Sequence, residues 1–244
     1  MLSIENVTKR FGGIVAVDNC TFSVSTGQIV SLIGPNGAGK STLFNCISNI
    51  DTADSGKILF EDTRLDKTPT HKIARLGIGR SFQLTRVLDE LSVTENLVLH
   101  TASGFGFNLF RSSVTKEDKI RADELMHFLG IYHMRNSAMN ELSYGQKKLL
   151  DLGTVLMSNP RLILLDEPAA GVNPRLLETI LEKILALKNQ GKTILLVEHN
   201  MKLVMGISDH VVVMAAGTVL KQGTPTNIQS DEDVLAAYLG KTTK

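Results

Sequence analysis

A glycine-rich segment of the chain carries the residue types that hold phosphate groups. Residues 34–41 read Gly-Pro-Asn-Gly-Ala-Gly-Lys-Ser, which is a complete G-x-x-x-x-G-K-S pattern. The glycines let backbone N–H groups surround phosphate oxygens, and the start of a helix adds partial positive charge. Lys40 would reach the β- and γ-phosphates of a nucleotide, and the Ser41 hydroxyl would hold Mg²⁺. The expected nucleotide contacts in this segment are Gly34, Pro35, Asn36, Gly37, Ala38, Gly39, Lys40, Ser41 and Thr42.

Two neighbouring acids end an apolar run further along the chain. Asp166 and Glu167 directly follow Leu162–Leu165, which has the composition of a buried strand. Neighbouring side chains of a strand point to opposite faces, so the two acids can have different roles. Asp166 would contact the Mg²⁺ shell, and Glu167 would act on an attacking water as general base. In combination with residues 34–41, this pair predicts a P-loop NTPase.

A third pattern combines a helix start with a glycine. Residues 142–146 read Leu-Ser-Tyr-Gly-Gln, and Ser143 with Gln146 has the spacing of a capping box. A capped helix start beside a glycine can hold a second anion. Gln146 lies 20 residues before Asp166, which leaves room for one helix and one strand between the two motifs.

Short apolar runs alternate with helical patterns along much of the chain. Runs without polar alternation are typical of strands in a parallel sheet that is covered on both faces. The expected strands of this kind are Ile29–Ile33, Leu162–Leu165, Ile194–Val197 and Val211–Met214. Helical patterns occupy Lys40–Ile50 and Arg175–Lys188, where Leu and Ile recur at helical spacing in the second segment. This order predicts an α/β fold with a mostly parallel sheet.

Other regions depart from this order. Three shorter runs predict an antiparallel sheet near the N-terminus, namely Leu2–Val7, Phe22–Val24 and Ile58–Phe60. Between Leu84 and Asn159 there is little strand pattern, and Glu117–Leu129 and Gln146–Met157 read as helices of an inserted helical lobe. The tail Asp231–Leu239 reads as a short terminal helix.

Composition excludes several classes of protein. The chain has 244 residues, of which 43% are hydrophobic and 21% charged, so it is not intrinsically disordered. A formal charge of +1 gives no bulk attraction to nucleic acid, and no nucleic-acid partner is expected. The N-terminus lacks a signal-peptide pattern, and no apolar run reaches the roughly 18 residues of a membrane helix. Cys20 and Cys46 read as small buried thiols.

Together these motifs resemble the ATP-binding cassette (ABC) family, whose signature reads LSGGQ, with Tyr144 at the third position in this chain. The resemblance implies a RecA-like P-loop core with a mostly parallel sheet, an N-terminal antiparallel β subdomain and an inserted α-helical subdomain. The implied parts are a nucleotide-binding core at 1–83 and 160–225, a helical signature subdomain at 84–159, and a C-terminal helical tail at 226–244.

The resemblance also assigns roles to residues outside the first motifs. Phe11 would stack on adenine and Val17 would contact the nucleotide, although Phe11 also reads as a core residue. Gln83 would join core to helical lobe and sense Mg²⁺, and His199 would contact the γ-phosphate rather than being a plain surface histidine. The implied catalytic set is Lys40, Gln83, Glu167 and His199, and the implied metal ligands are Ser41, Gln83 and Asp166.

A head-to-tail dimer is a further implication of the family. ATP bound at residues 34–42 of one subunit would be covered by the partner's signature residues, and the partner would be a second copy or a paralogous ATPase. The covering residues would be Ser143, Tyr144, Gly145 and Gln146. Residues 169–174 occupy the place of the family's D-loop, with Asn173 where an aspartate is usual, and Asn173 is expected near the subunit interface.

Subfamily detail favours transport. The stretches RLGIGRSFQLTRVLDELSVTENLVL, LSYGQKKLL and DEPAAGVNPRLL resemble the ATPase subunits of branched-chain amino-acid-type importers. The resemblance implies an ATPase on the cytoplasmic face of a membrane, bound to integral-membrane permease subunits and served indirectly by a substrate-binding protein. Urea-type importers and soluble assembly ATPases of the iron–sulfur scaffold type remain as alternatives.

Two segments could contact the membrane subunits. The aromatic loop Gly104–Phe110 would either fold onto the helical lobe or contact a permease or paralogue. The groove near Gln83–Asn96 is where the family receives a short helix of the permease.

Overall fold

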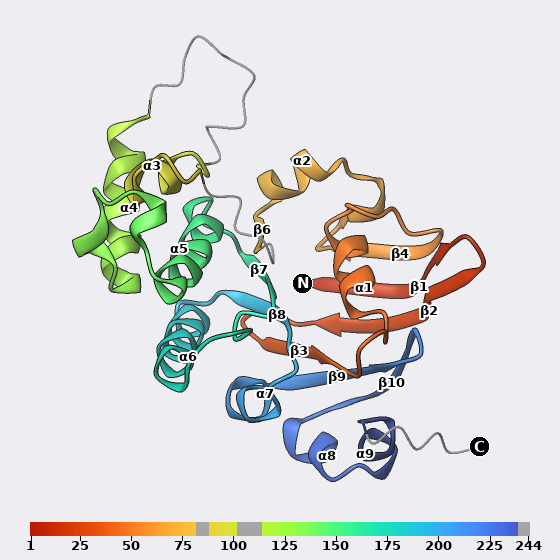
Figure 1. Ribbon diagram of the computed structural model, residues 1–244. Coiled ribbons are helices and arrows are strands. Elements are labelled where there is room, and N and C mark those ends of the chain that lie inside the picture. Colours follow the sequence, from red (N-terminus) through yellow and green to blue (C-terminus); the bar gives the residue numbers. More distant parts are fainter. Residues whose placement is uncertain (82–87, 102–113, 239–244) are drawn as a thin grey trace.

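The computed structural model of the chain describes residues 1–81, 88–101 and 114–238 (Figure 1). Gln83 and the loop Gly104–Phe110 therefore lie outside the described residues, as does the end of the C-terminal tail.

A six-stranded sheet forms the centre, with strand order β10-β9-β3-β8-β7-β6. The strands are β3 (Ile29–Ile33), β6 (Ile78–Arg80), β7 (Leu162–Asp166), β8 (Thr193–Val197), β9 (His210–Ala215) and β10 (Thr218–Gly223). Every pair is parallel except β10 on β9. The predicted mostly parallel sheet and its four apolar strands are confirmed, whereas β6 and β10 were not expected.

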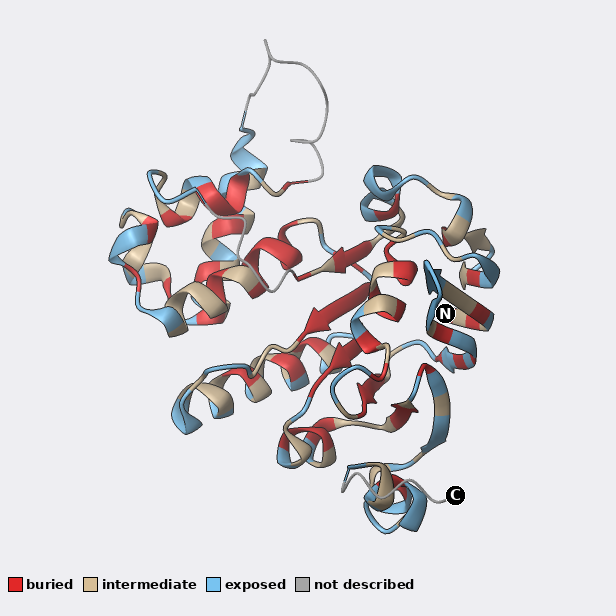
Figure 2. Cartoon of the chain, turned by 45° about the vertical axis from the view of Figure 1, so that its right-hand side comes forward, coloured by how far each residue is buried: buried red, intermediate tan, exposed pale blue. Residues whose placement is uncertain are grey.

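The central strands are buried on both faces, which explains their continuous apolar runs (Figure 2). In β3, Ile29 and Ile33 belong to one cluster of buried side chains, and Val30 and Leu32 belong to another. The same alternation holds in β7, β8 and β9. A strand that packs on both sides has no face left for polar side chains.

An antiparallel sheet covers one face of the central sheet, with α1 (Lys40–Ile47) buried in the same cluster (Figure 1). Its strand order is β2-β1-β4-β5, with bounds β1 (Leu2–Phe11), β2 (Ile14–Val24), β4 (Ser55–Phe60) and β5 (Thr63–Arg64). The three N-terminal strands expected from the sequence belong to this sheet, which confirms the antiparallel β part. Cys20 and Cys46 are buried in this cluster as free thiols, and burial raises their pKa values to about 11 and about 12.

The helical lobe consists, in its described part, of α3 (Val93–Val98), α4 (Lys116–Leu129) and α5 (Tyr144–Met157), with short η3 (Tyr132–Met134) and η4 (Met139–Glu141). Gly153 lets α5 approach its neighbours, because a Cβ there would lie 2.9 Å from Leu129 and 3.0 Å from Leu97. The buried side chains of the lobe continue without a break into those of the central sheet. The expected boundary between 83 and 84 falls outside the described residues.

The remaining helices lie on both faces of the central sheet and at its ends, since their buried side chains are divided between the two clusters (Figure 1). They are α2 (Thr70–Ile73), α6 (Pro174–Asn189), α7 (Met201–Ile207), α8 (Pro225–Gln229) and α9 (Glu232–Tyr238), with η1 (Leu65–Lys67) and η2 (Ala74–Leu76). α6 buries Ile180, Ile184 and Leu187 on the sheet, as its spacing predicts. None of the helices in the described ranges has the length and apolarity to cross a membrane.

Asp151 on α5 gives the fold a measurable pH dependence. Its carboxylate has neither an ion pair nor a hydrogen bond with any residue described, and burial raises its pKa from 3.8 to about 6. The folded chain therefore binds this proton more tightly than the unfolded chain, so stability is lost as pH rises from about 4 through about 6.

We predict that Asp151→Asn raises the free energy of unfolding at pH 7.5 and leaves it nearly unchanged at pH 4, because only the ionised carboxylate is penalised by burial. Urea unfolding of both proteins across this range measures the difference. A gap between the two curves that stays constant with pH would contradict the assignment.

Candidate functional site

The phosphate-binding segment lies between β3 and α1, as its motif requires. Gly34 has φ 147° and Gly39, which precedes α1, has φ 96°. A Cβ at Gly34 would lie 2.1 Å from the carbonyl oxygen of Met214, and one at Gly39 would lie 2.2 Å from that of Ala16. Both positions therefore need glycine for backbone conformation and for space. The loop therefore passes close to the backbones of β2 and β9, and the first N–H groups of α1, which lack partners within the helix, would be available to a bound anion.

Lys40 is buried inside this loop. Its ammonium donates to the carbonyl oxygens of Gly34 at 2.8 Å and Pro35 at 3.0 Å. Burial lowers its pKa, and the nearby carboxylates of Glu167 and Asp166 act in the opposite direction. The Lys40 ammonium therefore lies close to Glu167 and Asp166. A phosphate group bound in the loop would contact this ammonium.

A pocket of about 480 Å³ opens over the phosphate loop, and of the two acids only Glu167 lines it. It is lined by Ile14, Val15, Ala16, Asn36, Gly37, Ala38, Gly39, Lys40, Ser41, Thr42, Glu167, His199, Ala216 and Gly217. The predicted phosphate-loop residues from Asn36 to Thr42 thus line one cavity together with Glu167 and His199. Gly34 and Pro35 do not line this cavity, but their carbonyl groups accept hydrogen bonds from Lys40.

Val17 and Phe11, both expected at the nucleotide, lie in different environments. Val17 does not line the pocket, because its side chain on β2 turns inward and is fully buried in the core. This corrects the expected contact, and Ile14, Val15 and Ala16 of the same strand line the pocket instead. Phe11 is 47% exposed and pairs with Ile14 across the β1-β2 hairpin, with the Lys9 ammonium 5.2 Å from its ring centroid. It is thus a surface aromatic beside the pocket and not a core residue.

Glu167 and His199 are in direct contact, although they follow different strands. The His199 Nε2 atom lies 2.6 Å from Glu167 Oε1. Glu167 has φ 49°, a left-handed conformation that non-glycine residues rarely adopt, and its N–H donates to Val197 O at 3.0 Å. The sharp exit from β7 turns this carboxylate toward the pocket while Asp166 stays in the sheet.

Asp166 ends β7 as a buried carboxylate. Its Oδ1 atom has no hydrogen-bond partner within the described ranges, its Oδ2 atom lies 3.7 Å from Arg80 Nη2, and its N–H donates to Ser81 Oγ at 3.0 Å. Burial raises the pKa of Asp166, and Arg80 opposes that shift. An unpartnered, desolvated carboxylate oxygen is the kind of ligand that suits Mg²⁺.

Arg80 was missed by sequence reasoning. From β6 it donates to Phe44 O at 3.2 Å and Asn45 Oδ1 at 2.7 Å on α1, and to Ser48 Oγ at the C-cap of that helix. It thereby connects the end of the phosphate-loop helix with Asp166 and adds a cation at the C-terminal end of the helix dipole. A lone arginine in the short run Ile-Gly-Arg carries no sequence pattern that could have marked it.

Glu198 was also missed. This buried carboxylate accepts hydrogen bonds from Ala169 N at 2.9 Å, His199 N at 3.0 Å and Asn200 N at 3.2 Å. It therefore holds the backbone beside His199 and the loop that follows Glu167. A buried acid directly before the candidate histidine was visible in the sequence, but nothing in the sequence told which backbone groups it would bind.

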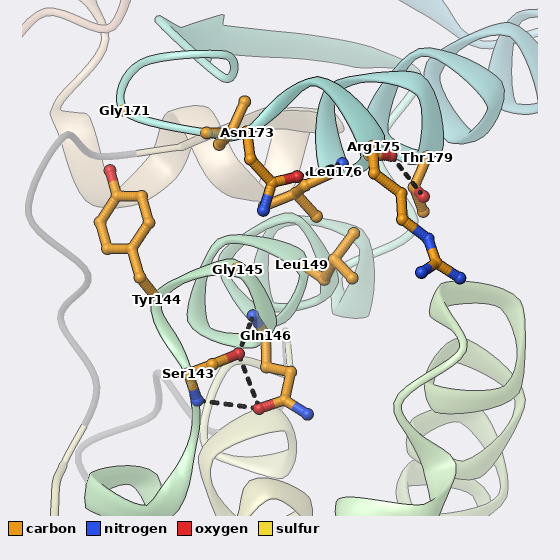
Figure 3. Close-up of a pocket in the computed structure, with 11 residues that line it drawn as sticks. Ser143, Tyr144, Gly145, Gln146, Leu149, Gly171, Asn173, Arg175, Leu176 and Thr179 are labelled. Carbon is orange, nitrogen blue, oxygen red and sulfur yellow. Dashed lines mark hydrogen bonds between the residues drawn. The ribbon is translucent and has the colours of Figure 1, made fainter.

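The signature residues form a second pocket of about 520 Å³, shown in Figure 3. The predicted capping box is present, since Ser143 Oγ accepts from Gln146 N and Gln146 Oε1 accepts from Ser143 N at 2.8 Å. Tyr144, Gly145 and Asn173 line the same pocket, and Asn173 Oδ1 caps α6 by accepting from Leu176 N at 2.9 Å. This pocket shares no lining residue with the phosphate pocket. The structure thus brings the two predicted anion sites into separate cavities.

The fold and the phosphate pocket define a nucleotide-binding protein of the P-loop class. Comparison with known proteins narrows this class: the sequence profile of the ABC transporter family matches residues 17–170. The chain belongs to the ABC transporter family, as one of its ATP-binding cassettes.

The chain is similar along nearly its whole length to transport ATP-binding proteins and to solved ATP-binding cassettes. The chain is 39% identical to the high-affinity branched-chain amino acid transport ATP-binding protein BraF of Pseudomonas aeruginosa, over 99% of this chain and 98% of BraF. The same figures hold for LivG of Escherichia coli K12, which carries the same description. Among solved structures, the ADP conformation of MJ1267, an ATP-binding cassette of an ABC transporter, is 35% identical with a TM-score of 0.89 over 98% of both chains. The dimeric structure of MJ0796, a bacterial ABC transporter cassette, is 25% identical with a TM-score of 0.81 over 92% of this chain and 99% of that one.

We predict that Arg80→Met lowers the free energy of unfolding by about 2–4 kcal/mol, because it leaves the buried Asp166 carboxylate without its nearest cation and removes hydrogen bonds to α1 and to its C-cap Ser48. Denaturant unfolding at pH 7 measures the loss. Arg161→Met serves as the matched control, since the Arg161–Glu61 ion pair is exposed and is worth no more than about 1 kcal/mol. Equal losses in the two variants would contradict the role given to Arg80.

Proposed function

We propose that this chain hydrolyses ATP to energise the import of branched-chain or chemically related amino acids, from the cytoplasmic face of a membrane. The observation that carries the proposal is the 39% identity over 99% of the chain to BraF and LivG, both described as ATP-binding proteins of branched-chain amino acid transport. The contact between Glu167 and His199 at the rim of the phosphate pocket supports the hydrolytic part.

Each polar group of the phosphate pocket has a place in this chemistry. Lys40 and the N–H groups of α1 would bind the phosphates and offset charge on the transferred phosphoryl group. Glu167 would orient the attacking water and accept its proton, and His199 would hold the Glu167 carboxylate and contact the γ-phosphate. Ser41 and Asp166 would hold Mg²⁺, which neutralises phosphate charge when bound; Gln83, the third proposed ligand, lies outside the described residues.

A head-to-tail dimer would complete the site. The phosphate pocket and the signature pocket are separate cavities of one chain, so one nucleotide cannot occupy both. In the proposed arrangement Ser143 and Gly145 of one subunit cover the nucleotide of the other, and Asn173 lies near the interface. The MJ0796 cassette, which shares the fold, is described as dimeric. The partner would be a second copy or a paralogous ATPase.

A third cavity supports docking of a permease. This groove of about 510 Å³ lies between the helical lobe and the core, and most of its exposed lining is apolar. Its walls come from α2, η2 and β6 on one side, including Ile73 and Ile78, and from α5 on the other, including Val155. We propose that it receives a short helix of the permease. Residues 88–96, the described part of the expected stretch Gln83–Asn96, do not line this groove, and residues 83–87 lie outside the described residues.

Glu167→Gln is predicted to keep ATP affinity and to lower steady-state ATPase activity by about 10²–10⁴-fold, because the amide cannot accept a proton. Calorimetry measures the affinity and phosphate release measures the turnover. Lys40→Ala is the contrasting variant: it should lose ATP affinity, since it removes the cation inside the phosphate loop. Unchanged turnover in Glu167→Gln would refute the assignment of the general base.

Capture of complexes from membranes tests the transport function. Tagged Glu167→Gln protein, pulled down with ATP from its native membranes and analysed by mass spectrometry, should bring down permease subunits and a cassette ATPase. The permease would identify the class of substrate, including a urea-type one. Recovery of soluble partners alone would refute transport in favour of an assembly ATPase.

A further inference from the structure

The loop that follows Glu167 is held from two sides within the same chain. On one side, the hydroxyl of Tyr144 in the signature donates to Ala170 O at 2.9 Å. On the other side, Glu198 Oε1 accepts from Ala169 N at 2.9 Å. These two neighbouring residues of the D-loop therefore connect α5 with the segment that carries His199.

The Tyr144 contact depends on its hydroxyl group. The tyrosine is 55% exposed, so burial of the ring does little to fix its position. The D-loop is shaped to receive the phenol: Gly171 has φ 70°, and a Cβ there would lie 3.1 Å from Tyr144 Oη. Figure 3 shows Tyr144 directed toward the loop near Gly171, away from Ser143 and Gln146 of the same helix start. The aromatic ring thus spans the gap between the signature and the D-loop.

The Glu198 carboxylate is buried, and both of its oxygens accept hydrogen bonds. Glu198 is 3% exposed, and its second oxygen accepts from His199 N at 3.0 Å and Asn200 N at 3.2 Å. The His199 ring in turn meets Glu167 at 2.6 Å. A shift of the D-loop would therefore change the position of Glu198, of the backbone at His199, and of the histidine's contact with Glu167.

We propose that Tyr144 is a positioning residue for ATP hydrolysis, whose hydroxyl transmits the placement of the signature helix through Ala169–Ala170 and Glu198 to the His199–Glu167 pair of the same subunit. This inference rests on the proposed function. It adds that the signature pocket and the phosphate pocket of one chain are joined by a hydrogen-bonded path. ATP of the partner subunit, when covered by the signature residues, would therefore alter the catalytic geometry at this chain's own phosphate pocket.

The test compares steady-state ATPase activity of the full chain with that of Tyr144→Phe. Loss of a single hydrogen bond to an exposed carbonyl should lower kcat roughly 3- to 10-fold, while ATP affinity in the Glu167→Gln background stays within about two-fold. Amide exchange should accelerate at residues 170–172 and stay unchanged in α6. Tyr132→Phe is the matched control, because the Tyr132 hydroxyl forms no hydrogen bond with the described residues and its ring stacks on His127.

A double-mutant cycle separates a path from two independent supports. Glu198→Gln keeps one oxygen acceptor and loses the carboxylate that holds the backbone of residues 199 and 200. If the path exists, the double variant Tyr144→Phe with Glu198→Gln should be hardly slower than Glu198→Gln alone.

Each other outcome has a defined meaning. Additive losses of kcat in the cycle, or an unchanged kcat in Tyr144→Phe beside an active wild-type chain, would overturn the path and leave the proposed function standing. A wild-type chain that binds ATP and does not hydrolyse it would count against the proposed function itself.

Discussion

Burial of the central strands on both faces is the constraint from which the rest of the structure follows. Because β3, β7 and β8 are parallel neighbours in register, their carboxyl ends meet at one edge of the sheet. The phosphate loop, the acids at 166 and 167 and His199 all leave the sheet at that edge. Loops thus carry the chemistry, whereas backbone ladders such as Asp166 beside Val197 determine where each loop begins.

The same edge collects charges that burial disfavours. Burial lowers the pKa values of Lys40 and Arg80 and raises that of Asp166, because it penalises the charged form of each group. Nearby acids oppose the shifts of both cations, and Arg80 opposes the shift of Asp166, so these opposite charges stabilise one another. Such mutually dependent charges in a cleft are typical of functional sites. They also explain why polar partners from three elements, β6, β7 and α1, converge on a region that hydrophobic packing alone would have left apolar.

Local patterns predicted much of this molecule. The apolar strands, the phosphate loop and the capping box of Ser143 depend on residues within a few positions of one another, and all three are present. Contacts between distant segments were not predictable: Arg80 reaches α1 across 36 residues of sequence, and Glu198 reaches Ala169 across 29. Val17 was misplaced for a related reason, since the inward side of β2 depends on its pairing with β1, where the register shifts. β6 is too short, at three residues, for any period to be visible.

The two attachments of the D-loop differ in what their rupture would cost. Glu198 is buried, so opening its bond with Ala169 N would leave a buried carboxylate short of a donor, which costs free energy. The Tyr144 bond lies at the surface, where water can replace either partner at little cost. The Tyr144 bond is therefore the weaker of the two attachments, and the signature helix shifts the D-loop only while that bond is closed. The exposed bond is thus the reversible one, and a residue type that can make or release it without unfolding its surroundings is suited to that place.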